Sequence, residues 1–211
     1  MKKIAVFASG SGSNADKIIE RLTPSYAKAS EGKPNPSPDG EGSKITPKIK
    51  VALIVCNKPE AGVLKIAEEN NIPSLLIEKE KFFRGDGYVG ELKKMGIDFI
   101  ILAGFLWKLP DALIKAFPKK IINIHPALLP NYGGKGMYGR FVHEAVIANK
   151  EKESGITIHY ADQHYDNGDI IFQARCPVLP DDSVDTLAAR IQKLEHEHFP
   201  AVIERLIIEG N

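Results

Sequence analysis

The chain has 211 residues, of which 43% are hydrophobic, so it is long enough to bury a sizeable core. Its 28 Lys and Arg residues nearly balance 27 Asp and Glu residues, and a formal charge of +1 gives no electrostatic attraction to nucleic acid or to an anionic membrane. No apolar run approaches the roughly 18 residues of a membrane span, so we expect one globular domain, residues 1–211, that acts on small molecules.

Signals for export and for disulfide or metal frameworks are weak. The N-terminal stretch "MKKIAVFASGSGSN" contains too short an apolar run for a signal peptide. Cys56 and Cys176 are far apart and form no Cys-x-x-Cys pair, so neither a disulfide framework nor a zinc site is indicated. These features predict a cytoplasmic protein.

The first half of the chain alternates short apolar runs with amphipathic segments. The runs are nearly continuous, as in strands that are covered on both faces, and they span 3–8, 50–55, 74–77, 98–103 and 121–124. Helices are predicted between them at about 14–22, 60–70, 86–95 and 110–117. This alternation predicts an α/β fold with a doubly wound, mostly parallel sheet and right-handed crossovers.

The turn "ASGSGSN" joins the first strand to the first helix. Its glycines and serines let backbone N–H groups approach an anion at the helix N-terminus, where the helix dipole favours negative charge. Residues 10–15 satisfy the dinucleotide pattern G-x-G-x-x-G/A, but the second predicted strand ends in Asn57 and Lys58, not in a ribose-binding acid. The spacing of a nucleotide-triphosphate loop is also absent. A single phosphate monoester is therefore the favoured ligand, and a plain strand-to-helix turn is the alternative.

Residues 23–44 interrupt the alternation of strands and helices. No Ile, Leu, Val, Phe or Met lies between Leu22 and Ile45, where Pro, Gly, Ser, Lys and Glu predominate. Such a segment buries too little apolar surface to offset the entropy lost on ordering. We predict a flexible surface insertion, with a binding loop as the alternative.

The segment "INIHPALLP" (122–130) places two polar side chains in an apolar strand. Asn123 and His125 are two residues apart and therefore lie on the same face, at the carboxyl end of a parallel strand, where doubly wound sheets bind ligands. An Asn amide and an imidazolium are both hydrogen-bond donors and could form an oxyanion hole. The alternative is a structural histidine beside a strand-terminating asparagine.

After residue 140 the pattern changes to longer alternating strands, which predict an antiparallel or mixed extension of the sheet. A helix, two strands and a terminal helix are expected at 140–149, 154–161, 169–178 and 183–207. The loop between the two strands offers Asp162, Asp166 and Asp169, and spacing alone does not choose among these carboxylates. His143 and Glu144 lack the second histidine of a zinc-protease helix, so no metal site is predicted.

Five motifs together resemble phosphoribosylglycinamide formyltransferases of de novo purine (IMP) biosynthesis, and they occur in that family's order: "SGSGSN", "LAGFLWKLP", "INIHPALLP", "DNGDIIFQ" and "RIQKLEHEHFP". The resemblance covers nearly the whole chain outside 23–44. It implies a Rossmann-like enzyme that transfers the formyl group of 10-formyltetrahydrofolate to the amine of glycinamide ribonucleotide. It also implies no tightly bound cofactor, a monomer or homodimer, a nucleotide-phosphate half at about 1–100 and a folate and catalytic half at about 101–211.

The resemblance assigns residues to three roles. The catalytic residues would be Asn123, His125 and Asp166. The nucleotide would contact Gly10, Ser11, Gly12, Ser13, Asn14, Gln192 and Glu195. The folate would contact Leu106, Trp107, Lys108, Leu109, Ala161, Asp162, Gln163 and Asp166. Two features depart from the family pattern: the loop 131–144 lacks the usual proline and closely spaced histidines, and Arg84 is offset from the arginine that binds the glutamate tail of folate.

In the expected mechanism, Asn123 and a protonated His125 donate to the oxyanion of a tetrahedral intermediate. Asp166 would raise the pKa of His125 and relay the amine's proton through an ordered water. The alternatives are two other enzymes that use 10-formyltetrahydrofolate: a methionyl-tRNA formyltransferase and a deformylase. Each of these would be expected to carry a further domain, which 211 residues do not accommodate. Two alternatives come from other classes of protein: a non-catalytic phosphometabolite-binding protein and an NAD-dependent oxidoreductase.

Overall fold

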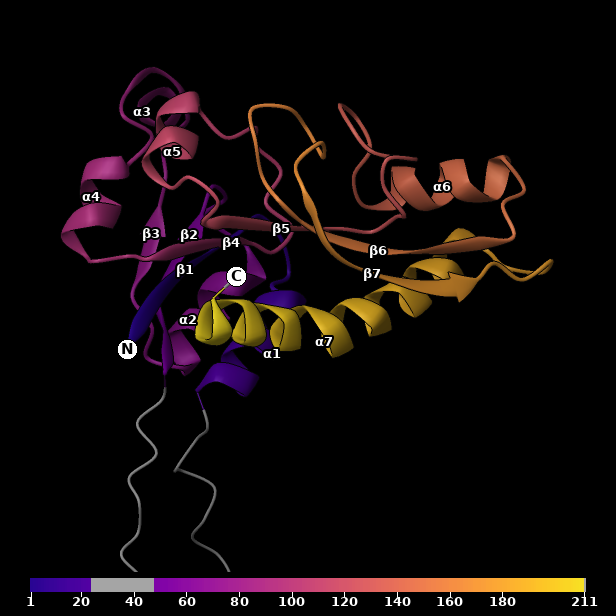
Figure 1. The fold of residues 1–211 in the computed structure, drawn as a ribbon, viewed down its shortest axis with the longest axis horizontal. Coiled ribbons are helices and arrows are strands. Elements are labelled where there is room, and N and C mark those ends of the chain that lie inside the picture. Colours follow the sequence, from indigo (N-terminus) through magenta and orange to yellow (C-terminus); the bar gives the residue numbers. More distant parts are fainter. Residues whose placement is uncertain (24–47, 211) are drawn as a thin grey trace, which may run out of the picture.

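The computed structural model of the protein describes residues 1–23 and 48–210, so nearly all of the predicted insertion at 23–44 lies outside the described residues. Within them, seven strands form one sheet in the order β3-β2-β1-β4-β5-β6-β7 (Figure 1). The strands are β1 Lys2–Ala8, β2 Ile49–Cys56, β3 Ser74–Leu76, β4 Phe99–Leu102, β5 Ile121–His125, β6 Glu153–Tyr160 and β7 Ile170–Pro177. Strands β1 to β5 run parallel, whereas β6 is antiparallel to both of its neighbours, which confirms the predicted fold class.

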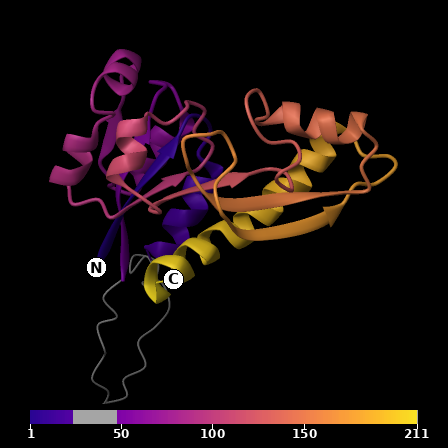
Figure 2. The same ribbon diagram turned by 45° about the horizontal axis from the view of Figure 1, so that its top comes forward.

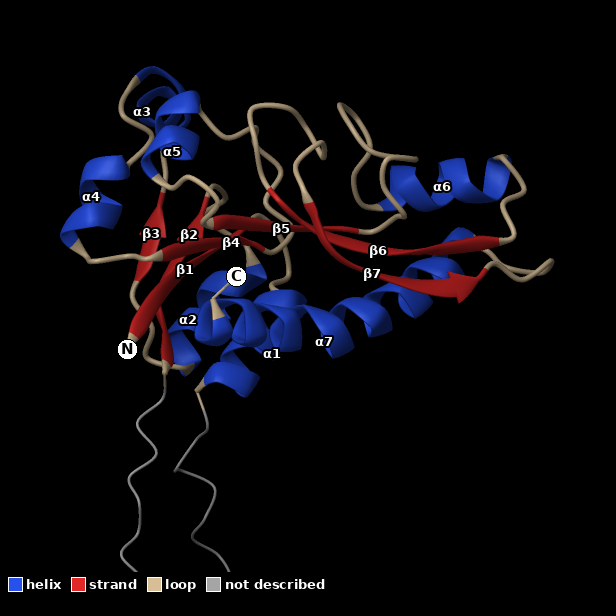
Figure 3. Cartoon of the chain, viewed as in Figure 1, coloured by secondary structure: helices blue, strands red, loops and turns tan. Residues whose placement is uncertain are grey.

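Helices cover both faces of the sheet, as Figure 3 shows. They are α1 Ser13–Leu22, α2 Gly62–Glu69, α3 Lys79–Arg84, α4 Val89–Lys94, α5 Asp111–Ala116, α6 Arg140–Ala148 and α7 Val184–Glu209. Alternating side chains of β1 show the two layers: Ile4 and Val6 belong to the core that includes α1, α2 and α7, while Ala5 and Phe7 belong to the core under α3, α4 and α5. Because β1 is buried on both faces, its sequence is apolar at consecutive positions.

The predicted helix at 86–95 is wrong in its extent. Only α4 lies within that range, since the separate short helix α3 ends at Arg84, and α4 begins at Val89 because Gly87 and Tyr88 both have left-handed backbones, with φ angles of 65° and 63°. The side chain of Asp86 accepts hydrogen bonds from the N–H groups of Tyr88 and Gly90, at 3.0 and 2.9 Å, and this stabilises the turn before α4.

Helix α7, with 26 residues, connects the two ends of the molecule. Its first turn has a capping box in which Ser183 and Thr186 exchange hydrogen bonds between side chain and backbone. The helix packs against α6 near its start and against α1 further along, and Figure 2 shows it crossing beneath the sheet. It therefore brings residues from the C-terminal part of the chain to the N-terminus of α1.

The turn between β1 and α1 depends on a glycine for packing. Gly12 has a φ angle of 85°, and a Cβ atom at this position would lie 2.8 Å from the Cα and Cβ atoms of Val63 in α2. The contact between this turn and α2 thus requires a glycine, whether or not a ligand also approaches the turn.

We expect Gly12→Ala to lower the free energy of unfolding by about 2 to 4 kcal/mol, the sum of left-handed strain and overpacking. Gly10→Ala is the matched control, since no atom lies within 4 Å of a Cβ atom there. Denaturant unfolding of both variants measures the difference. Equal stabilities for the two would contradict this explanation of Gly12.

Candidate functional site

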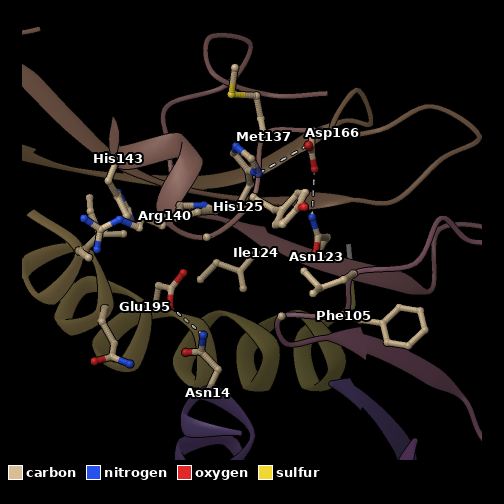
Figure 4. Close-up of a pocket in the computed structure, with 18 of the residues that line it drawn as sticks. Asn14, Phe105, Asn123, Ile124, His125, Met137, Arg140, His143, Asp166 and Glu195 are labelled. Carbon is tan, nitrogen blue, oxygen red and sulfur yellow. Dashed lines mark hydrogen bonds and ion pairs between the residues drawn. The ribbon is translucent and has the colours of Figure 1, made fainter. Parts of the chain in front are cut away.

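A cavity of about 880 Å³ opens beside the carboxyl ends of β4 and β5. Strand β1 lies between β2 and β4, and the chain order reverses there, so the cavity is next to the topological switch point where doubly wound sheets bind ligands. It is lined by Asn14 of α1, by the segments 104–106, 123–126 and 134–140, and by one face of α7 (Figure 4).

Asn123, His125 and Asp166 meet at this cavity. Asp166 Oδ1 lies 3.4 Å from Asn123 Nδ2, and Asp166 Oδ2 lies 3.5 Å from His125 Nδ1 (Figure 4). The other two candidate carboxylates lie elsewhere, since Asp162 accepts a hydrogen bond from the N–H of His164 and Asp169 makes an exposed ion pair with Lys119. The structure therefore places only Asp166 against the polar end of β5.

His125 is neutral in the free protein. Its Nε2 lies 2.7 Å from the carbonyl oxygen of Tyr132, so Nε2 carries the proton and donates it to that oxygen. Burial lowers the pKa of His125, and this outweighs the opposing effects of the Asp166 charge and of the Tyr132 carbonyl. Asp166 does raise the pKa of His125, as expected, but the residue is only 3% exposed and burial has the larger effect, so the protonated imidazole that was expected is not favoured in the free protein.

Asp166 is ionised. Burial pushes its pKa upward, but the opposing effects of its neighbours, among them the N–H of Gly134 at 3.0 Å from Oδ2, leave the pKa below its ordinary value. A charged carboxylate and a neutral imidazole therefore lie side by side.

His159 is a site residue that the sequence interpretation missed. It lies opposite Asn123 in the antiparallel β5–β6 pair, it is 1% exposed, and its Nε2 lies 3.0 Å from Asn123 Nδ2. Its Nδ1 lies 2.9 Å from the Tyr160 carbonyl oxygen and donates to it, so Nε2 accepts from the Asn123 amide. The signal was a polar residue at an alternating position of an apolar strand, but only the strand register shows what it faces.

The predicted nucleotide residues divide into two groups. Asn14, Gln192 and Glu195 line the cavity. Asn14 Nδ2 donates to Glu195 Oε2 at 2.8 Å, and Gln192 Nε2 donates to Ser13 Oγ at 3.2 Å, so α7 and the start of α1 are linked at this point. Burial raises the pKa of Glu195 against the hydrogen bond from Asn14. The remaining predicted residues, Gly10, Ser11, Gly12 and Ser13, are in the adjoining turn but are not lining residues.

The predicted folate residues are less concentrated. Leu106 lines the cavity, whereas Trp107 packs against the rings of Phe82 and Phe83 with centroids 5.6 and 5.5 Å away, and Leu109 is buried beneath α3 to α5. Four further predicted residues are absent from the cavity lining: Lys108, Ala161, Asp162 and Gln163. Arg84 is paired with Glu80 at the surface.

The loop that departs from the family pattern forms one wall of the cavity. Lys135, Met137, Tyr138 and Arg140 line it, together with His143 from α6. Burial lowers the pKa of His143, and the nearby His125 adds to this effect. The sequence showed this loop to be unusual, but its four glycines gave no indication of which side chains face inward.

Two absences concern only the residues that the structure describes. Among 1–23 and 48–210, no cluster of three or more His, Cys, Asp or Glu side chains could hold a metal ion. In the same ranges no helix has both the length and the apolar character needed to cross a membrane.

The doubly wound sheet, with a polar trio at a switch-point cavity, defines a class of α/β proteins that bind small ligands at the carboxyl ends of their strands. A sequence profile of the family described as "Formyl transferase" matches residues 40–203, which is more than half of the chain. The chain belongs to the formyl transferase family, as its motifs indicated.

Curated relatives agree with this assignment. The chloroplastic phosphoribosylglycinamide formyltransferase of Arabidopsis thaliana is 41% identical over 207 residues, which are 96% of this chain but only 64% of that protein. Phosphoribosylglycinamide formyltransferase of Bacillus subtilis (strain 168) is 36% identical over 98% of this chain and 95% of its own length. The crystal structure of phosphoribosylglycinamide formyltransferase from Bacillus halodurans superposes with a TM-score of 0.80 at 30% identity, covering 100% of this chain and 97% of that one. The chain thus spans under two-thirds of its plant relative and nearly all of the bacterial ones.

Proposed function

We propose that this protein transfers the formyl group of 10-formyltetrahydrofolate to the amine of glycinamide ribonucleotide, giving formylglycinamide ribonucleotide and tetrahydrofolate in de novo purine biosynthesis. The observation that carries the proposal is the approach of one ionised carboxylate, Asp166, to within 3.5 Å of both Asn123 and His125 at the switch-point cavity. The names of the relatives support this choice of substrates over other formyl acceptors.

The donors are expected to act in the transition state. When the amine attacks the formyl carbon, negative charge develops on the formyl oxygen, which Asn123 Nδ2 and His125 Nδ1 would stabilise. Nδ1 is the nitrogen of His125 that can serve the substrate, since Nε2 already donates to Tyr132. The free imidazole is neutral, so it would take up a proton from solvent at Nδ1 as the oxyanion forms and return it to solvent when the intermediate collapses, and the negative charge of the oxyanion favours that protonation.

Asp166 is the proposed proton acceptor. The attacking amine acquires positive charge and loses a proton, which Asp166 would take up through an ordered water. The carboxylic acid would then return the proton to the folate nitrogen as the bond between that nitrogen and the formyl carbon breaks. His159 holds one hydrogen of the Asn123 amide, so the weaker 3.4 Å bond from Asn123 to Asp166 is the one that the oxyanion would replace.

Binding of the two substrates is proposed on the residues that the family resemblance suggested. The nucleotide phosphate would lie at the turn from Gly10 to Asn14, because a helix N-terminus offers N–H groups without intrahelical acceptors. The rest of the nucleotide would contact Gln192 and Glu195, and it would compete with the existing bonds between these side chains and α1. The pterin would bind beside Leu106 and the segment 161–166.

The assembly and location are part of the same proposal. We expect a monomer or homodimer with no tightly bound cofactor and no nucleic-acid partner. The cytoplasm is the proposed location, and the two free, buried cysteines, Cys56 and Cys176, are compatible with its reducing conditions.

The test is an absorbance assay of 10-formyltetrahydrofolate with and without glycinamide ribonucleotide. The proposal predicts consumption of the folate only when the nucleotide is present. Consumption at the same rate without the nucleotide would instead favour a deformylase.

A further inference from the structure

Tyr132 lies in the connection between β5 and α6, and it contacts groups on both sides of that connection. Its carbonyl oxygen accepts the hydrogen bond from His125 Nε2 at 2.7 Å. Its phenol, on the other side, donates to Glu151 Oε1 at 2.6 Å and accepts from Asn149 Nδ2 at 3.1 Å. Burial and the Glu151 carboxylate raise the pKa of the phenol, so it remains a donor at neutral pH.

The backbone at Tyr132 is held in an unfavourable conformation. Its φ angle is 57°, in the left-handed region, which is unfavourable for a residue with a Cβ atom. A strained residue persists only where its surroundings fix it, and the phenol's two hydrogen bonds to the α6–β6 turn are such a constraint. In this conformation the Tyr132 carbonyl oxygen faces His125 Nε2.

The residues that follow contact the carboxylate beside the same histidine. A Cβ atom at Gly133 would lie 3.2 Å from the Cβ atom of Asp166, and the N–H of Gly134 donates to Asp166 Oδ2 at 3.0 Å. The three-residue link 132–134 therefore contacts both His125 and Asp166, and a shift of Tyr132 would move the link against both.

We infer that Tyr132 is a positioning residue, whose phenol anchors the backbone carbonyl that keeps the neutral His125 protonated on Nε2 with Nδ1 toward Asp166. This inference rests on the proposed function for its effect on catalysis, but the positioning itself is a property of the protein without substrates. If the carbonyl were free to move, the proton of the neutral ring could shift to Nδ1. The hydrogen bond that fixes the orientation of the ring, and so the position of Nδ1 at the cavity, would then be lost.

The first readout is the tautomer of His125, measured by long-range ¹H–¹⁵N NMR of the imidazoles above their pKa, with His125→Ala to assign the signals. The wild-type protein is expected to show the Nε2–H form. Tyr132→Phe and Glu151→Ala, which remove the phenol's hydroxyl and its acceptor, are expected to give a mixture with the Nδ1–H form. Glu151→Gln retains an acceptor and should restore the wild-type spectrum.

The second readout is steady-state kinetics of the same variants. We expect Tyr132→Phe and Glu151→Ala to lower kcat about three- to tenfold, which corresponds to about 0.7 to 1.4 kcal/mol, with KM for both substrates unchanged. Arg175→Gln is the matched control, since it removes an exposed ion pair with Glu153 in the same region and leaves Tyr132 untouched.

The outcomes separate the two proposals. A Tyr132→Phe protein that is folded and retains the wild-type tautomer would overturn the inference, as would an unchanged kcat in an active enzyme. If the wild-type protein lacks transferase activity, the proposed function fails and the NMR spectra alone decide whether Tyr132 positions His125. If Tyr132→Phe does not fold, the comparison of Glu151→Ala with Glu151→Gln tests in the same way whether the phenol positions His125.

Discussion

Replacement of His125 by alanine is expected to lower kcat by about a hundredfold to a thousandfold, and Asn123→Ala is expected to do the same. Each change removes one donor to the oxyanion, and a single such donor contributes about 2.7 to 4 kcal/mol in enzymes that stabilise oxyanions. The effect should fall on kcat, with KM for both substrates within a few-fold of the wild-type value, because the donors are strengthened only as charge develops.

The controls for this prediction are a histidine elsewhere and a measurement of folding. His198 lies on α7 against the ring of Phe172, and His198→Ala should retain the wild-type kcat. Asn123→Ala leaves the buried His159 Nε2 without its donor, so its thermal unfolding must be measured beside its kinetics. Folded His125→Ala and Asn123→Ala proteins with near-normal kcat would return both side chains to a structural role.

Asp166→Asn is the second large effect expected. The variant keeps the shape of the side chain but loses the charge, and loss of a positioned proton acceptor typically costs a hundredfold or more in kcat. The His125→Ala, Asp166→Asn double variant should be about as impaired as the worse single variant, since residues that act as one unit are not additive. A double variant whose defect equals the product of the two single defects would show that the residues act independently.

The same carboxylate has a measurable effect on the ionisation of His125. The Asp166 charge raises the pKa of His125 against the larger opposite effect of burial. Asp166→Asn should therefore lower the pKa of His125 further, and an NMR titration should show its midpoint at a more acidic pH than in the wild-type protein. A midpoint that moves toward neutral pH would contradict the assigned contact.

Much of the fold was predictable because the central strands are covered on both faces. A strand such as Lys2–Ala8 is nearly continuous in apolar residues, and that pattern with intervening helices is typical of a doubly wound sheet. The failure at 86–95 has a local cause. Periodicity does not report backbone conformation, and the left-handed residues Gly87 and Tyr88 prevent the helix from starting at 86.

The candidate site was predictable only as far as local geometry reaches. Asn123 and His125 share a face by the two-residue period of a strand, so their proximity followed from the sequence. The choice of Asp166 over Asp162 and Asp169 depends on the path of the loop, where Asp166 itself has a φ angle of 53°, and residue-level reasoning did not make that choice. His159 required the register of the β5–β6 pair, which is a contact between distant segments.

The prediction for His125 was incomplete for a related reason, although the Asp166 charge does raise its pKa as expected. Sequence reasoning included the neighbouring carboxylate but not the burial of the imidazole, and burial has the larger effect. The free protein consequently starts from a neutral histidine, and protonation of Nδ1 becomes a step of the proposed reaction.

A single-turnover measurement with 10-formyltetrahydrofolate labelled in the formyl carbon tests the central claim most directly. Wild-type protein, in excess over the labelled folate and saturated with glycinamide ribonucleotide, should place one labelled formyl group on the nucleotide for each folate consumed. His125→Ala should bind both substrates but transfer the label at about one-hundredth of the wild-type rate or slower. Release of the label as formate by the wild-type protein, or transfer at the wild-type rate by His125→Ala, would contradict the claim that Asn123, His125 and Asp166 carry out formyl transfer.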